Sequence, residues 1–297
     1  MESLKLDSLP SNYVSANNIR VHYVRSGQGP PMVLLHGWPE FWYTWRHCIP
    51  TLAKQYSVVA PDLRGFGDTE KSPPGRNAGS PAETLAEDLL GLIDELGFDR
   101  IALVSGDVGA YASMAFARKW PERLRGLFFF CCPYPGIGRR YGQPDHLIEV
   151  WYQYFNQLPW AAELVGSSRE SCRTYFKHFL DHWSGDDPTV FAQDLEIWVD
   201  NFMKPGNIQG GFNWYLSSAA TRLLSIEEKL PLKPKIEVPS RFLWGKHDPI
   251  VKPEWSDRLQ EYFASFTIDF IDAGHFVHYQ RPDIAVAEIL HFFEARN

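Results

Sequence analysis

Short apolar runs alternate with segments of helical spacing along the first half of the chain. Strands are predicted where β-branched and aromatic residues run together, at residues 19–24, 32–35, 57–60, 101–104 and 127–131. The later runs are apolar throughout, which is typical of parallel strands that are covered on both faces. The sequence therefore indicates a buried, mostly parallel sheet.

A helix is predicted before the fourth of these runs. Ser80-Pro81-Ala82-Glu83 provides an N-cap, a proline at the first helical position and a capping-box glutamate. Apolar residues then recur every three or four positions, and Gly97 ends the pattern. The residues of this stripe are Leu85, Leu89, Leu92, Ile93 and Leu96. Strands and helices in this order predict a doubly wound α/β sheet.

The pattern changes after residue 132. From Pro133 to about Leu224 the chain is rich in Trp, Tyr, Phe and His without strand-like runs, and we predict several helices there. Strands resume at 238–244 and 266–271, and an amphipathic helix is predicted at 284–293. We therefore expect a core domain, residues 1–134 and 225–297, interrupted by a helical cap domain, residues 135–224. The turn-rich loop 71–80 is expected to be solvated.

Composition and net charge limit the kinds of molecule that this protein is expected to bind. The 297 residues are 44% hydrophobic and 22% charged, an ordinary globular balance. The net charge of -7 argues against nucleic acid or an anionic membrane as a partner, and small neutral ligands are favoured. The chain lacks a signal-peptide pattern and an apolar run long enough to span a membrane, so we expect a cytoplasmic protein.

Cofactor chemistry is not indicated by the sequence. We find no metal-binding cluster, P-loop or dinucleotide fingerprint, and therefore expect no cofactor and no metal. The four cysteines have no C-x-x-C spacing and are expected to be buried, reduced thiols. They are Cys48, Cys131, Cys132 and Cys172.

The motif VSGDVGA at residues 104–110 has the pattern of a nucleophile elbow, in which a nucleophile between small residues follows a strand and begins a helix. Asp107 stands where a serine hydrolase carries its serine. In isolation the motif also fits a surface turn, in which the aspartate accepts backbone hydrogen bonds. The interpretation therefore depends on residues elsewhere in the chain.

Two downstream residues complete a possible catalytic set. Asp248 follows one predicted strand and His275 follows the next, and the order nucleophile, acid, histidine is that of α/β-hydrolases. Singly, Asp248 also fits an Asp-Pro turn and His275 a core histidine. Two other histidines, His247 and His278, are less favoured as the base because neither directly follows a strand. The carboxyl ends of parallel strands meet at one edge of a sheet, where we expect the set to converge.

A fourth element is the sequence His36-Gly37-Trp38-Pro39, which follows the strand at 32–35. This fold places an oxyanion-hole loop at that point, and we expect the backbone N–H groups of Trp38 and Val108 to point at one oxygen. Residues 131–132 are an alternative place for the acid in this fold. They are cysteines, which leaves Asp248 as the acid.

Taken together, these motifs and the segment PDLRGFGDTEKS at 61–72 resemble the epoxide hydrolase branch of the α/β-hydrolase superfamily. Two further segments, 151–170 and 210–218, are similar to the cap of bacterial epichlorohydrin-type enzymes. The resemblance covers nearly the whole chain and implies an α/β-hydrolase fold with a helical cap inserted after the sixth strand. Gly106 and Val108 depart from the family, which usually has a histidine before the nucleophile and an aromatic residue after it.

The resemblance implies a chemistry that an aspartate can perform. A carboxylate with a pKa near ~4 is ionised at neutral pH and needs no base to attack an epoxide carbon. His275, oriented by Asp248, would then activate the water that hydrolyses the ester, and two cap phenols would protonate the epoxide oxygen. The family's cap tyrosines fall on Tyr152 and Tyr215. Substrate contacts are expected from Trp38, Pro39, Trp151, Trp214 and Phe276.

Other functions remain open at this point. A haloalkane dehalogenase commonly holds the halide with a Trp after the nucleophile, and Val108 has no such N–H. A haloacetate dehalogenase would want arginines there, and residues 108–113 contain none. A serine esterase would require Ser105 to be the nucleophile. A non-catalytic small-ligand receptor on the same scaffold is the remaining alternative, and the oligomeric state is not predicted.

Overall fold

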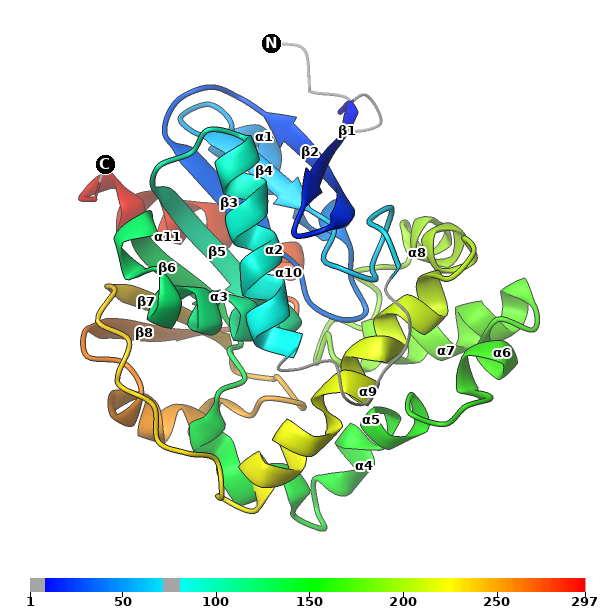
Figure 1. Cartoon of the computed structure of the whole chain (residues 1–297). Coiled ribbons are helices and arrows are strands. Elements are labelled where there is room, and N and C mark those ends of the chain that lie inside the picture. Colours follow the sequence, from blue (N-terminus) through cyan, green and yellow to red (C-terminus); the bar gives the residue numbers. More distant parts are fainter. Residues whose placement is uncertain (1–8, 72–80, 297) are drawn as a thin grey trace.

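An eight-stranded sheet forms the centre of the computed structural model, which describes residues 9–71 and 81–296 (Figure 1). The strand order is β1-β2-β4-β3-β5-β6-β7-β8, and only the pairs β1–β2 and β2–β4 are antiparallel. The strands are β1 (Ser11–Ala16), β2 (Ile19–Ser26), β3 (Pro31–Leu35), β4 (Ser57–Pro61), β5 (Ile101–Gly106), β6 (Leu124–Phe130), β7 (Ser240–Gly245) and β8 (Phe266–Ile271).

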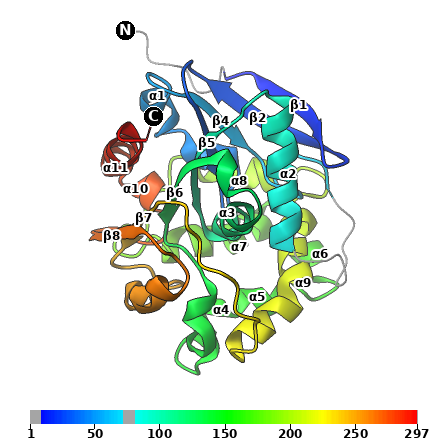
Figure 2. The same cartoon turned by 60° about the vertical axis from the view of Figure 1, so that its left-hand side comes forward.

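Helices cover both faces of this sheet. Helices α2 and α3 pack side by side on one face, and α1, α10 and α11 lie on the other (Figures 1 and 2). These helices are α1 (Ile49–Leu52), α2 (Pro81–Glu95), α3 (Asp107–Lys119), α10 (Val277–Gln280) and α11 (Pro282–Glu294). The predicted doubly wound, mostly parallel sheet is therefore confirmed.

A helical segment connects β6 to β7, and the described residues between these strands include no further strand of the sheet. Its helices are α4 (Leu147–Val150), α5 (Tyr152–Phe155), α6 (Ala161–Val165), α7 (Arg169–His182), α8 (Leu195–Phe202) and α9 (Asn207–Ile226). Short 3-10 helices are η2 (Trp42–Trp45), η3 (Pro121–Arg123), η4 (Pro135–Gly142) and η5 (Pro253–Glu261). We call α4–α9 the cap segment; α9 continues two residues past the predicted cap boundary at 224.

Differences from the predicted strands have local causes. The strand β6 ends at Phe130 rather than 131, because Cys131 adopts a positive φ of 39°, which extended backbone does not. The strand β7 begins only at Ser240, after Pro239, which has no N–H to donate to a neighbour. The edge strand β1 was not predicted, because its side chains alternate between exposed and half-buried and form no apolar run. Ser80 and residues 72–79 of the turn-rich loop lie outside the described residues.

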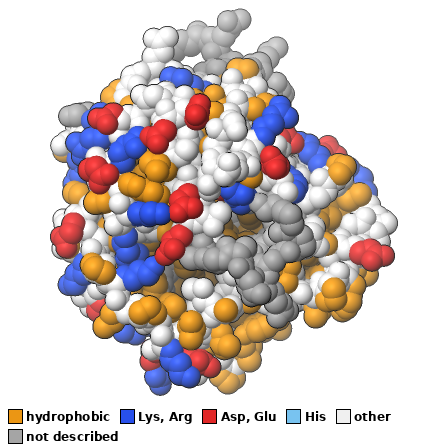
Figure 3. Space-filling model, in the orientation of Figure 1, with side chains coloured by type: hydrophobic (Ala, Val, Ile, Leu, Met, Phe, Trp, Pro, Cys, Tyr) orange, Lys and Arg blue, Asp and Glu red, His pale blue; other side chains and the backbone are white. Residues whose placement is uncertain are grey.

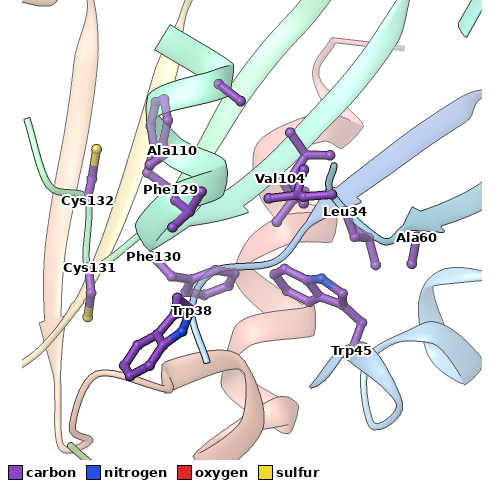
Figure 4. Close-up of a cluster of buried hydrophobic side chains, with 14 of the residues drawn as sticks. Leu34, Trp38, Trp45, Ala60, Val104, Ala110, Phe129, Phe130, Cys131 and Cys132 are labelled. Carbon is purple, nitrogen blue, oxygen red and sulfur yellow. The ribbon is translucent and has the colours of Figure 1, made fainter. Parts of the chain in front are cut away.

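The core is dominated by the inner strands β3, β5 and β6. Their central side chains are fully buried, and aromatic rings pack beside them, including Trp38, Trp45 and Phe130 (Figure 4). All four cysteines are buried and free, as predicted. Acidic and basic side chains lie interspersed on the face seen in Figure 3. Within residues 9–71 and 81–296, no helix combines the length and apolar character needed to cross a membrane.

Candidate active site

Asp107 lies at the sharp turn between β5 and α3. Its φ of 45° is in the left-handed region, a conformation that costs energy for a residue other than glycine and is often found at functional sites. The turn leaves no room for side chains nearby. A Cβ on Gly109 would lie 2.8 Å from the carbonyl oxygens of Leu35 and His36, and one on Gly37 would lie 2.5 Å from the Asp107 Cβ. Glycine at positions 37 and 109 therefore allows the loop that follows β3 to lie directly against Asp107.

Two backbone N–H groups donate hydrogen bonds to this carboxylate. The N–H of Trp38 donates to Asp107 Oδ1 at 2.8 Å, and the N–H of Val108 also donates to the carboxylate. Burial raises the pKa of Asp107, although the positive charge of His275 and these two N–H groups act in the opposite direction. Two backbone N–H groups directed at one carboxylate are the kind of donors that form an oxyanion hole, and Oδ1 is the oxygen that Trp38 binds.

His275 joins the two aspartates. Its Nδ1 lies 2.8 Å from Asp248 Oδ2, and its Nε2 lies 3.7 Å from Asp107 Oδ2. Asp248 is fixed in turn by the N–H groups of Ile250 and Val251, which donate to its other oxygen at 2.9 and 3.0 Å. The structure thus brings together the three residues that the sequence places 141 and 27 positions apart.

The electrostatics of the histidine follow from this position. Burial alone would lower the pKa of His275, but the charge and hydrogen bond of Asp248 and the charge of Asp107 outweigh it and raise the pKa to about 9. The imidazole therefore favours its protonated form at neutral pH, with Asp248 at Nδ1 and Asp107 near Nε2. Loss of the negative charge on Asp107 would lower this pKa.

The competing residues face other partners. His278 Nε2 contacts Glu40 at 3.0 Å and Thr44 at 2.9 Å, and His247 Nε2 contacts Asp272 at 2.7 Å. Ser105 is fully buried in β5, where its hydroxyl accepts a hydrogen bond from Ser113 at 2.8 Å. Ser105 is therefore not placed as a nucleophile, which removes the serine esterase alternative.

Both tyrosines expected in the cap lie beside the oxyanion loop. The Tyr152 ring stacks on the Trp38 ring with centroids 4.9 Å apart, and the Tyr215 ring meets both at 5.4 Å. Both are almost fully buried. Burial raises the pKa of each phenol above its ordinary value, and the charge of Asp107 adds to this effect. Both phenols thus keep their protons at neutral pH and are available as acids.

The residues expected to contact substrate are not all in one place. The backbone of Trp38 donates to Asp107 while its ring packs against both tyrosines, and the Phe276 ring meets the His275 ring at 5.4 Å. The carbonyl of Pro39 accepts a hydrogen bond from Trp198 of α8. Trp214 packs against Tyr111 and lines a cavity of about 150 Å³ between α2 and α9, while Trp151 is about one-third exposed on the cap segment.

Sequence reasoning missed Glu40, which lies beneath the oxyanion loop. Its Oε2 accepts the N–H of Gly37 at 2.9 Å and its Oε1 contacts His278 at 3.0 Å. Burial would raise the pKa of Glu40, but the charge and hydrogen bond of His278 and the Thr44 hydroxyl lower it to about 2. A carboxylate in the apolar stretch between Pro39 and Phe41 was the available signal, because a buried charge requires partners.

Comparison with known proteins agrees with this geometry. Residues 30–282 match the α/β hydrolase fold family. The sheet, the elbow and the convergence of Asp107, His275 and Asp248 are those of an α/β-hydrolase, and the chain belongs to that superfamily.

Named relatives narrow the family further. The chain is 33% identical to a soluble epoxide hydrolase of Corynebacterium sp. (strain C12), over 93% of this chain and 94% of the relative. It is 30% identical to human epoxide hydrolase 4, over 91% of this chain and 75% of the relative. The solved structure of epoxide hydrolase CorEH without ligand superposes with a TM-score of 0.84 at 29% identity, over 98% of this chain and 100% of that chain. The chain therefore belongs to the epoxide hydrolase family.

Proposed function

We propose that this protein hydrolyses an epoxide to a vicinal diol through a covalent ester on Asp107. The observation that carries the proposal is the position of the Asp107 carboxylate, whose Oδ1 accepts the N–H of Trp38 and whose Oδ2 lies near His275; the N–H of Val108 is a second donor to the carboxylate. One oxygen is thus held as the future carbonyl oxygen, and the other is left to attack. The relatives that are named epoxide hydrolases support the choice of substrate.

The first step forms the ester. Asp107 Oδ2 attacks one epoxide carbon, and the bond between that carbon and the ring oxygen breaks. The ring oxygen leaves as an alkoxide, a poor leaving group unless it is protonated, and it takes a proton from Tyr152 or Tyr215. Because burial keeps both phenols protonated, the acids are in the required state at neutral pH.

The second step breaks the ester. The carboxylate charge of Asp107 is lost on ester formation, and we expect the pKa of His275 to fall, which makes the imidazole a base. His275 Nε2 then takes a proton from water, and the hydroxide adds to Asp107 Cγ. The negative charge that develops on the carbonyl oxygen is stabilised by the N–H groups of Trp38 and Val108. When this intermediate collapses, the bond between Cγ and the substrate-bearing oxygen breaks, and the leaving alkoxide takes the proton from His275 and departs as the diol. The proton of the new Asp107 carboxyl returns to the phenolate, which restores the resting site.

Dehalogenation shares the first attack but differs at the leaving group. A halide needs N–H donors and no proton, whereas an epoxide oxygen needs an acid. The tyrosines beside Trp38 supply acids, and Val108 supplies no side-chain N–H next to the nucleophile. We therefore favour the epoxide over haloalkanes and haloacetates.

The decisive experiment is intact-protein mass spectrometry of His275→Gln after exposure to styrene oxide or epichlorohydrin. We expect an adduct of one whole substrate mass, because the ester forms but no base activates water. Asp107→Asn should give no adduct. His247→Gln is the matched control, since the His247 side chain is about one-third exposed and pairs with Asp272 rather than with Asp107 or Asp248, and it should turn over without accumulating ester.

Other outcomes are equally informative. An adduct that has lost halide from epichlorohydrin would favour a dehalogenase. The absence of adduct, together with wild-type protein that forms no diol and releases no halide, would leave the small-ligand receptor. Water as the second substrate, the absence of a cofactor, the cytoplasmic location and the lack of nucleic-acid or membrane partners remain predictions from the sequence.

A further inference from the structure

The sulfur of Cys131 lies next to the pair formed by Asp248 and His275 and could bind a metal ion together with them. Its sulfur, a carboxylate oxygen of Asp248 and a ring nitrogen of His275 all lie within 4.8 Å of one another, and the three residues are buried. They come from three connections at the same edge of the sheet, after β6, β7 and β8. The steps of the proposed reaction do not use the sulfur.

The backbone holds this sulfur in place. Cys131 has a φ of 39°, an unfavourable conformation for a residue with a side chain, and the N–H of Gly245 donates to its sulfur at 3.4 Å. The carbonyl oxygen of Gly274 lies 3.8 Å from the same atom. Figure 4 shows that the sulfurs of Cys131 and Cys132 point in opposite directions, so only the first is directed at the pair.

The set of sulfur, nitrogen and oxygen ligands selects a class of ion. Thiolate, imidazole and carboxylate together suit Zn²⁺ and similar borderline-soft cations, whereas Mg²⁺ and Ca²⁺ prefer oxygen alone. Bond lengths of about 2.0–2.3 Å in a tetrahedral site place ligand atoms roughly 3.3–3.8 Å apart. The present spacing therefore requires movements on the order of 1 Å to close around an ion.

We propose that Cys131, Asp248 and His275 form an inhibitory site for Zn²⁺ and related cations. The ion would replace the proton between His275 Nδ1 and Asp248 and the proton of the Cys131 thiol, and both protons are released to solvent. A neutral imidazole that is bound to metal through Nδ1 carries its proton on Nε2, and it cannot take a proton from water. If the reaction is the one proposed above, on which this consequence rests, Zn²⁺ blocks ester hydrolysis and spares ester formation.

Metal binding can be measured independently of activity. The wild-type protein is titrated with Co²⁺, which gives a near-ultraviolet charge-transfer band when bound to thiolate. We expect this band in wild-type protein and in Cys132→Ala, and its loss in Cys131→Ala. Cobalt bound at the exposed group Asp186, His247 and Asp272, whose ligand atoms also lie within 4.8 Å of one another, gives no thiolate band. A wild-type protein without the band, or a band that survives in Cys131→Ala, overturns the proposal.

The functional consequence is tested with ZnCl₂. For each variant, the rate of diol formation with Zn²⁺ is divided by its rate without Zn²⁺, so that basal differences cancel. We expect the concentration for half inhibition to rise at least about tenfold in Cys131→Ala and to stay near the wild-type value in Cys132→Ala. Zinc-treated wild-type protein should accumulate the ester, and a chelator should release it.

The two proposals fail in different ways. A thiolate band together with no ester in any variant would refute the covalent mechanism and leave the metal site standing. Ester formation in His275→Gln without any thiolate band in wild-type protein would support the covalent mechanism and refute the metal site. A band together with zinc that blocks ester formation itself would contradict the proposed position of the ion at Nδ1.

Discussion

Gly37→Ala tests the oxyanion hole. The Trp38 donor is a backbone N–H, which a substitution of Trp38 itself would leave in place, but a Cβ at position 37 pushes the loop that carries it away from Asp107. A Cβ at this position would lie 2.5 Å from the Asp107 Cβ and 2.9 Å from Oδ1. Ordinary contacts between carbon atoms are about 3.5–4.0 Å, so the loop must retreat by about 1 Å. Such a shift stretches the Trp38 N–H···Oδ1 distance from 2.8 Å to about 3.8 Å, beyond hydrogen-bonding range.

The expected effect falls on ester hydrolysis. Loss of one oxyanion donor typically raises the barrier by about 3–4 kcal/mol, which is about 10²–10³ in rate. Single-turnover mixing with excess enzyme, quenched for mass spectrometry, separates formation of the Asp107 ester from its breakdown. We expect the ester of Gly37→Ala to accumulate, because breakdown slows more than formation.

The matched control is Gly211→Ala. Its Cβ would meet the Trp38 ring at 3.4 Å, an ordinary contact, and it lies within helix α9, where alanine is favoured over glycine. This variant should keep a hydrolysis rate within about threefold of wild type, since the Trp38 backbone does not move. A folded Gly37→Ala protein, with a native circular dichroism spectrum, that breaks down the ester at the wild-type rate would refute the reasoning.

Three further predictions concern the pKa of His275, the two cap tyrosines and the buried carboxylate of Glu40. Asp107→Asn should lower the pKa of His275 from about 9, and Asp248→Asn should lower it further, because Asp248 is the larger cause of the increase. NMR titration of the His275 ring checks both variants, and an unchanged pKa would contradict the assigned pairing. Tyr152→Phe and Tyr215→Phe should each slow ester formation about tenfold, and the double variant by about 10²–10⁴, in the single-turnover assay; a double variant that forms ester normally would exclude both as acids. The pKa of Glu40 is lowered from 4.5 to about 2, so its ionised form contributes about 3 kcal/mol of stability above pH 4.5, and this contribution is lost as the pH falls toward 2. The stability difference between wild type and Glu40→Gln in urea unfolding should therefore be largest near pH 7 and narrow at pH 3, whereas a difference that is constant with pH would show that Glu40 is not ionised.

The convergence of Asp107, Asp248 and His275 was predictable from chain order. Each follows the end of a strand of a parallel sheet, so the order of apolar runs was enough to bring them to one edge. Glu40 was not predictable in the same way. Its role depends on His278, which is 238 positions away in the chain, and no local pattern announces that contact.

The side chains that surround Asp107 and Trp38 are set by tertiary packing, which the order of strands and helices in the sequence does not give. The cap tyrosines came from resemblance to a family, and only the three-dimensional arrangement shows that they pack against Trp38. Trp151 and Trp214 neighbour these tyrosines in sequence, yet their rings meet other partners, Phe155 and Tyr111, because adjacent residues on a helix face different directions. Adjacency in sequence to the tyrosines therefore does not give these tryptophans the same set of packing partners, and their contact with substrate remains a prediction.

The cap segment contacts the proposed active site through two hydrogen bonds as well as through its tyrosines. The carbonyl of Trp183 accepts the backbone N–H of His275 at 2.7 Å, and the Trp198 ring donates to the carbonyl of Pro39 at 3.0 Å. An engineer who exchanges this segment for that of a relative would therefore replace supports of the base and of the oxyanion loop together with the pocket walls. Chimeras that keep these two contacts should change substrate range, while chimeras that lose them should lose turnover for every substrate.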